Sequence, residues 1–127
     1  MVLTLKKLEN AIKNSWGEDT CYYKFLWKNK TQPESAGHCR VIAVIVNDYF
    51  GGKIYFSQVK GDPRYTHYWN RLPNGKLVDL TKDQFSKKAK LVKPIIISKK
   101  EALDNKKIQK TYPILKKKVI KYIKENY

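Results

Sequence analysis

The sequence lacks the cysteine patterns that are typical of zinc centres and dithiol redox enzymes. Its 127 residues include only two cysteines, Cys21 and Cys39, and these form no C-x-x-C pair. Together with His38 and His67 they match no common zinc-ligand spacing, so we expect no metal site. No phosphate-binding glycine loop or other cofactor motif is present, which predicts a protein without a cofactor. The sequence does not decide whether the two cysteines form a disulfide, although free thiols are the default in the cytoplasm.

Long hydrophobic runs are also missing. Residues 1–7 form no signal-peptide core, and no segment approaches the length of a transmembrane span, so we expect a cytoplasmic protein. Acidic residues are scarce: 11 Asp plus Glu stand against 27 Lys plus Arg, giving a net charge of +16. This excess is typical of proteins that bind an anionic partner, such as nucleic acid, a membrane surface or an acidic protein. The alternative is a solvated lysine surface, since the chain has no arginine stripe and no nucleic-acid-binding motif.

The residues that are abundant predict a folded α+β domain. Apolar residues make up 42% and aromatic residues 13% of the chain, which is enough for one domain with a hydrophobic core over residues 1–127. We expect an N-terminal helix, a buried helix that begins at a cysteine, an antiparallel sheet of three to four strands, and a C-terminal helix. The expected terminal helices cover residues 3–16 and 113–126, and the expected strands cover residues 53–59, 65–72, 76–80 and 93–98.

The most hydrophobic segment follows Cys39. Residues 41–46 are apolar on every side of a helix, which predicts a central, buried helix that ends at Gly51 or Gly52. A buried strand is the alternative, because valine and isoleucine dominate. The helix is favoured because the run continues through Asn47 and Asp48 without a turn. In its first turn, free backbone N–H groups and the helix dipole would stabilise a Cys39 thiolate.

A hairpin predicts which polar side chains share a sheet face. Pro73-Asn74-Gly75 has the composition of a three-residue loop with a left-handed glycine, and this loop places Trp69 opposite Asp79. His67 then lies on the same face as Trp69, diagonal to Asp79 and within reach of its carboxylate. A two-residue loop would shift the register by one and separate His67 from Asp79.

These residues suggest a catalytic triad. Cys39 would act as the nucleophile, His67 as the general base and acid, and Asp79 as the group that orients the imidazole, with the Cys39 backbone N–H in an oxyanion hole. Each residue also has a structural interpretation: a small core residue, a packed ring and a turn aspartate. Four further residues are candidates for substrate binding or for donating to the oxyanion, namely His38, Gln32, Trp16 and Trp69.

The blocks that carry these residues resemble the YunG family of small bacterial proteins. The resemblance rests on the segments 37–39, 47–52, 67–75, 78–81 and 84–85 and extends over roughly residues 1–125, including both terminal helices. Members usually have glutamine before the cysteine, whereas this chain has His38. If that glutamine is an oxyanion donor, an imidazole N–H would take its place here. The resemblance brings little functional information.

A second resemblance is to the transglutaminase-like branch of the papain-like fold. Those proteins carry cysteine at a helix start, then a strand with His-x-Trp, then a strand that ends in aspartate, as in His67-Tyr68-Trp69 and Leu77-Val78-Asp79. It implies a cysteine-dependent acyl hydrolase or transferase that acts on an amide or isopeptide bond of a protein or peptide. The alternative function is a non-catalytic basic protein that binds nucleic acid or an acidic protein.

Overall fold

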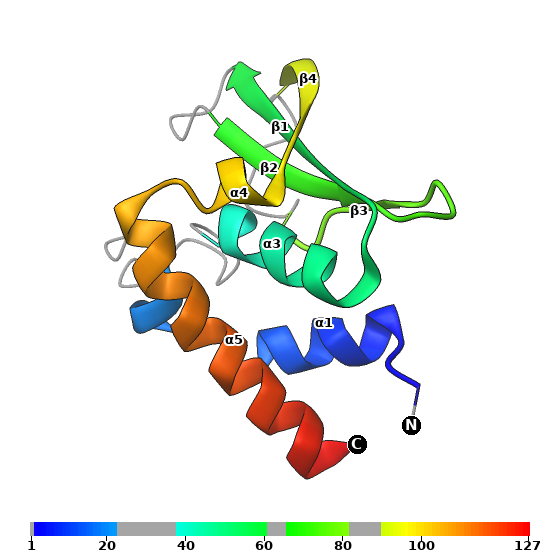
Figure 1. Ribbon diagram of the computed structural model, residues 1–127, viewed down its shortest axis with the longest axis vertical. Coiled ribbons are helices and arrows are strands. Elements are labelled where there is room, and N and C mark those ends of the chain that lie inside the picture. The colour runs from blue at the N-terminus through cyan, green and yellow to red at the C-terminus, as the bar shows by residue number, and fades with distance from the viewer. Residues whose placement is uncertain (1, 23–37, 61–65, 82–89) are drawn as a thin grey trace.

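A computed structural model describes residues 2–22, 38–60, 66–81 and 90–127. The helices are α1 (Leu5–Lys13), α3 (Cys39–Phe50), α4 (Lys99–Ala102) and α5 (Lys106–Asn126), with a 3-10 turn η1 (Glu18–Thr20), and the strands are β1 (Lys53–Lys60), β2 (Thr66–Arg71), β3 (Leu77–Val78) and β4 (Lys90–Ile97). Figure 1 shows α3 between the sheet on one side and the helices α1 and α5 on the other. The expected α+β architecture is thus confirmed.

Helix α3 forms the centre of the structure, as its sequence predicted. All six residues from Val41 to Val46 are buried, and Gly51 caps the helix at its C-terminus with a φ of 71°, a positive value that favours glycine. On the helical side α3 shares a core with Ile12 of α1 and Leu115 of α5. On the other side it packs on the sheet, so burial on all faces explains why the segment is apolar throughout.

The sheet is antiparallel, with the strand order β3-β2-β1-β4. Asn70 pairs with Val78, which is the register that the three-residue loop predicted. Gly75 adopts a φ of 88° within this loop. Strand β4 lies at the sheet edge, where Pro94 is tolerated because one side of an edge strand forms no ladder hydrogen bonds.

The terminal helices differ in length from their expected ranges. Thr4 caps α1 through its Oγ1, which accepts a hydrogen bond from the Lys7 N–H at 3.2 Å. This helix ends at Lys13, earlier than expected. Helix α5 begins at Lys106 and not at Pro113, because Asn105 caps it and accepts from two backbone N–H groups of the first turn. No helix among the described residues is long and apolar enough to cross a membrane.

Candidate active site

Cys39 lies at the N-terminus of the central helix. It is the first residue of α3, its side chain is half-buried, and both it and the buried Cys21 are free thiols. The disulfide alternative therefore does not describe this structure. Backbone N–H groups in the first turn of a helix have no intrahelical acceptor, so they surround the Cys39 position with hydrogen-bond donors.

His67 and Asp79 meet at the junction of β2 and β3. His67 Nε2 lies 2.5 Å from Asp79 Oδ2, and the His67 side chain is 2% exposed. The contact follows from the hairpin register, which places the two residues diagonally on one face. The other carboxylate oxygen, Asp79 Oδ1, accepts hydrogen bonds from the Thr81 N–H at 3.2 Å and from Thr81 Oγ1 at 3.4 Å. Thr81 thus holds Asp79 in a turn while Asp79 binds the imidazole.

The surroundings of His67 favour its cationic form. Burial lowers the pKa of His67, but hydrogen bonds to Asp79 and Cys39, together with the charges of both groups, outweigh burial and raise it to about 9. The same imidazole also interacts with the Cys39 thiol at the start of α3. His67 therefore joins the thiol of α3 to the carboxylate that follows β3.

Aromatic rings fix the orientation of the imidazole. The His67 and Trp69 rings stack with a centroid distance of 5.7 Å, and Tyr55 of β1 stacks on Trp69 at 5.6 Å. Trp69 is only 8% exposed. This candidate for substrate binding is therefore a largely buried ring between Tyr55 and His67, where it restricts the motion of the imidazole.

Two of the remaining sequence candidates, His38 and Trp16, pack on each other just before α3. His38 is fully buried immediately before α3, and its Nε2 lies 2.8 Å from Thr20 Oγ1. Trp16 is partly buried and packs on His38, with ring centroids 5.4 Å apart. The structure therefore brings His38 and Trp16 together and joins His38 to Thr20 of η1. Gln32 lies outside the described residues.

Three residues around the site were not among the sequence candidates: Thr20, Tyr55 and Thr81. Thr81 had a detectable signal, because aspartate followed two positions later by threonine is a common turn pattern. Tyr55 and Thr20 reach the site through strand pairing and loop placement, which have no local signature. Within the described part of the chain, no group of three His, Cys, Asp or Glu side chains is placed to bind a metal ion.

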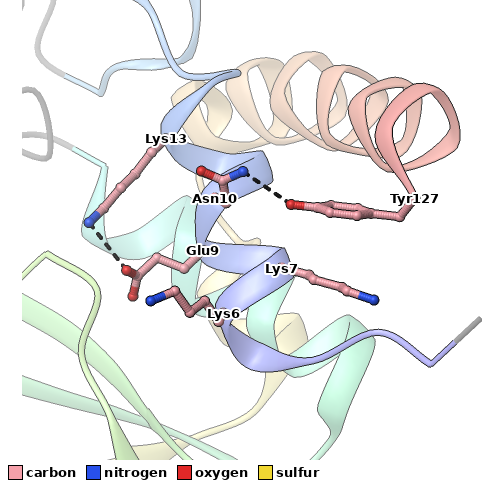
Figure 2. A pocket seen from close by; sticks show the side chains of 6 residues that line it. All are labelled: Lys6, Lys7, Glu9, Asn10, Lys13 and Tyr127. Carbon is pink, nitrogen blue, oxygen red and sulfur yellow. Dashed lines mark hydrogen bonds and ion pairs between the residues drawn. The ribbon is translucent and has the colours of Figure 1, made fainter.

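A separate surface pocket lies between α1 and the C-terminus. Figure 2 shows it lined by Lys6, Lys7, Glu9, Asn10, Lys13 and Tyr127. Glu9 and Lys13 form an ion pair of 3.3 Å, and Asn10 Nδ2 donates to Tyr127 Oη at 3.1 Å. The lining includes none of the three triad candidates, so we do not assign the proposed chemistry to this pocket.

Comparison with known proteins identifies the family to which the chain belongs. No curated protein and no solved structure matches it. The family whose description is "YunG protein" matches residues 4–124, a range that includes every residue of the site described above. Because this match spans nearly the whole chain, the protein belongs to the YunG family.

Proposed function

We propose that the protein is a cysteine-dependent acyl hydrolase or acyl transferase with Cys39, His67 and Asp79 as its triad. One observation carries the proposal: a single buried imidazole binds a carboxylate and also interacts with a thiol at a helix N-terminus. The thiol supplies a nucleophile, the ring supplies a proton carrier, and the carboxylate holds the ring in place. Separately each residue has a structural explanation, but their joint geometry is that of a nucleophile, base and orienting group.

The electrostatics favour a cationic imidazole next to Cys39. A His67 pKa of about 9 means that the imidazole carries a proton at neutral pH. In the proposed resting state, the cation pairs with a Cys39 thiolate, which the first turn of α3 also stabilises. The imidazolium then serves first as an acid, whereas a serine triad needs its histidine first as a base.

The proposed reaction proceeds through a thioester. Cys39 Sγ attacks the carbonyl carbon of an amide, and backbone N–H groups at the start of α3 stabilise the oxyanion. The C–N bond breaks as His67 gives its proton to the leaving nitrogen, which departs as an amine. Neutral His67 then takes a proton from a water molecule or a second amine while that group attacks the thioester. The C–S bond breaks, the acid or new amide leaves, and the thiolate–imidazolium pair is restored.

The order of the elements supports a papain- or transglutaminase-like assignment as part of this proposal. Cys39 begins a buried helix, His67 and Trp69 follow on a strand, and Asp79 directly follows the next strand. This is the order that the sequence resemblance implied. For the substrate we propose an amide or isopeptide bond in a protein or peptide, with acidic partners attracted by the net charge of +16.

Alkylation of Cys39 tests the proposal directly. Iodoacetamide labelling is followed at pH 6 by mass spectrometry of the wild type and of His67→Ala. We expect Cys39 to react at least about tenfold faster than free glutathione, because the thiolate is the reactive form, and we expect His67→Ala to remove this advantage. Buried Cys21 is the internal control, since its labelling would report unfolding.

Two outcomes would contradict the proposal. One is a Cys39 labelling rate equal to that of glutathione at pH 6. The other is rapid labelling that is unchanged in His67→Ala, because the imidazole would then play no part in activating the thiol. If Cys39 labels rapidly, thioester formation with amide and isopeptide substrates is the next measurement.

A further inference from the structure

Helix α5 carries its lysines in two groups with different surroundings. Eight of its 21 residues are lysines, and it has a single acidic residue, Glu125. Lysines that face the rest of the chain have partners: Lys116 pairs with Asp48 at 2.7 Å and Lys118 pairs with Asp19 at 2.9 Å. In addition, Lys107 lies over the Tyr22 ring at 4.8 Å. These three lysines thus hold α5 to its neighbours.

The other five lysines form an exposed row: Lys106, Lys110, Lys117, Lys121 and Lys124. At 3.6 residues per turn they fall within about 60° of helix circumference, and at 1.5 Å per residue the row is about 27 Å long. The opposite face of α5 is buried in the core. Figure 1 shows α5 at the outside of the helical layer. The row therefore faces away from the helices and the sheet against which α5 packs.

The charges in the row have little compensation from the protein itself. Among the described residues, one lysine of the row forms an ion pair: Lys121 Nζ lies 3.9 Å from Glu125 Oε1, and both side chains are exposed. Like charges four residues apart, such as Lys106 and Lys110, repel one another and destabilise a helix by a few tenths of a kcal/mol. The first turn of α5 contains no acidic residue, although the helix dipole favours one there. The lysines at the N-terminal end of the row thus work against helix stability, and an anionic partner would relieve this cost.

We propose that the lysine row binds the sugar-phosphate backbone of a nucleic acid. With both strands counted, a duplex carries a phosphate charge about every 1.7 Å of its axis, so a 27 Å row lies beside about sixteen phosphates, of which those on the facing side are within reach of the lysines. Long, flexible lysine side chains can reach the phosphates where the two backbones cross the row, and contacts of this kind carry no sequence information. The apolar face of α5 is occupied by its own core, so the helix has no apolar face with which to enter a lipid surface. This inference is independent of the proposed triad.

Salt-dependent binding to random-sequence duplexes tests this proposal. Fluorescence anisotropy of labelled 24-bp DNA and RNA duplexes is measured between 50 and 200 mM salt. If all five lysines contact phosphates, the logarithm of the binding constant should fall with a slope of about −4.5 against the logarithm of salt. Binding to one duplex or to both supports the proposal, and their comparison shows which backbone is preferred.

Two triple variants separate the row from net charge. Lys117→Gln/Lys121→Gln/Lys124→Gln and the control Lys53→Gln/Lys60→Gln/Lys90→Gln each lower the net charge from +16 to +13 by removing three exposed lysines. We expect the row variant to bind at least about tenfold more weakly, with a slope about 2.7 units shallower, and the control to change little. Cys39→Ala should bind like the wild type.

Several results would overturn the proposal. Equal losses in the two triple variants would show that diffuse charge, and not the row, attracts the duplex. The absence of duplex binding at 50 mM salt would also overturn it. Binding to vesicles that contain anionic lipid, or to poly-glutamate, without binding to either duplex would assign the row to a different class of partner. Thermal unfolding of each variant checks that the fold is retained.

Discussion

At the scale of single residues, the candidate site is a chain of contacts in which each member orients the next. Thr81 holds Asp79, Asp79 holds His67, and His67 contacts Cys39. The first half of this chain could be predicted because turn chemistry and strand alternation are local rules. The contact between His67 and Cys39 depends on how α3 packs against β2. No local pattern encodes that packing, so the sequence suggested this contact only through the chemistry of the three residues and the resemblance to known families.

Removing the charge of Asp79 should uncouple His67 from Cys39. In Asp79→Asn the imidazole loses a charged partner, so its pKa should fall by one unit or more from about 9. Fewer imidazolium cations then remain at pH 6 to 8 to pair with the thiolate. We expect Cys39 alkylation at pH 6 to slow by about tenfold. The measurement combines labelling kinetics with an NMR titration of the His67 ring.

The matched control is Asp104→Asn, which removes the same charge from an exposed position after α4. It should leave both the titration and the alkylation rate unchanged. Because the chain has only two histidines, His38→Gln assigns the His67 signals. An Asp79→Asn protein with an unchanged His67 titration would show that the carboxylate does not govern the ring.

At the scale of elements, the sequence predicted whether a segment is a helix or a strand, and how the strands pair, better than it predicted the residues at which the helices begin and end. The central helix ends at Gly51, as expected, because a glycine with a positive φ is a strong local stop signal. The predicted start of α5 was wrong. It was placed at Pro113 because proline is usually found in the first turn of a helix. Here it lies inside α5 with an exposed side chain, while Asn105 supplies the cap seven residues earlier than expected. A capping side chain outweighed the proline signal.

Gly52 should be essential for the connection between α3 and β1. Its φ is 82°, and a Cβ atom there would lie 2.1 Å from the backbone oxygen of Arg71 in β2. Gly52→Ala should therefore destabilise the protein by about 3 kcal/mol or more, because backbone cannot move aside as a flexible side chain can. Urea unfolding measures this loss. Alkylation of Cys39 should also slow, because the clash lies where the central helix joins the sheet.

Gly75 serves as a control that distinguishes the steric clash at Gly52 from the backbone strain of a positive φ. Its φ is 88°, but a Cβ atom there would meet nothing within 4 Å. Gly75→Ala should cost only about 1 kcal/mol, which is the usual cost of a left-handed conformation in a residue other than glycine. Equal losses of stability in the two variants would mean that close approach to β2 plays no part at Gly52.

At the scale of the whole molecule, a buried carboxylate joins the central helix to the C-terminal part of the chain. Asp48 of α3 is 6% exposed and pairs with Lys99 of α4 and with Lys116 of α5 at 2.7 Å. It also accepts a hydrogen bond from Tyr112 Oη at 2.5 Å. In the sequence, Asp48 served only as evidence that the helix continued. Its partners lie 51 to 68 positions away, so no local pattern could reveal them.

This arrangement predicts acid sensitivity. Burial raises the pKa of Asp48, but its hydrogen bonds with Lys116, Lys99 and Tyr112 outweigh burial and hold it below its ordinary value of 3.8. A lowered pKa in the folded state means that the stabilisation is present above about pH 4. It is lost as the pH falls through the folded-state value, because the unfolded chain then binds the proton more readily. We expect Asp48→Asn to lower the free energy of unfolding by about 1–3 kcal/mol at pH 6.

The difference between Asp48→Asn and the wild type should shrink toward pH 2, where the wild-type carboxyl is also protonated. Urea unfolding at pH 6, 4 and 2 measures it, and Asp104→Asn is again the control, because its side chain is exposed. A difference that stays constant from pH 6 to pH 2 would mean that the charge of Asp48 is unimportant and that only its shape matters. A difference that disappears with acid would show that one ionised side chain links α3, α4 and α5, and thereby fixes the helix that carries Cys39.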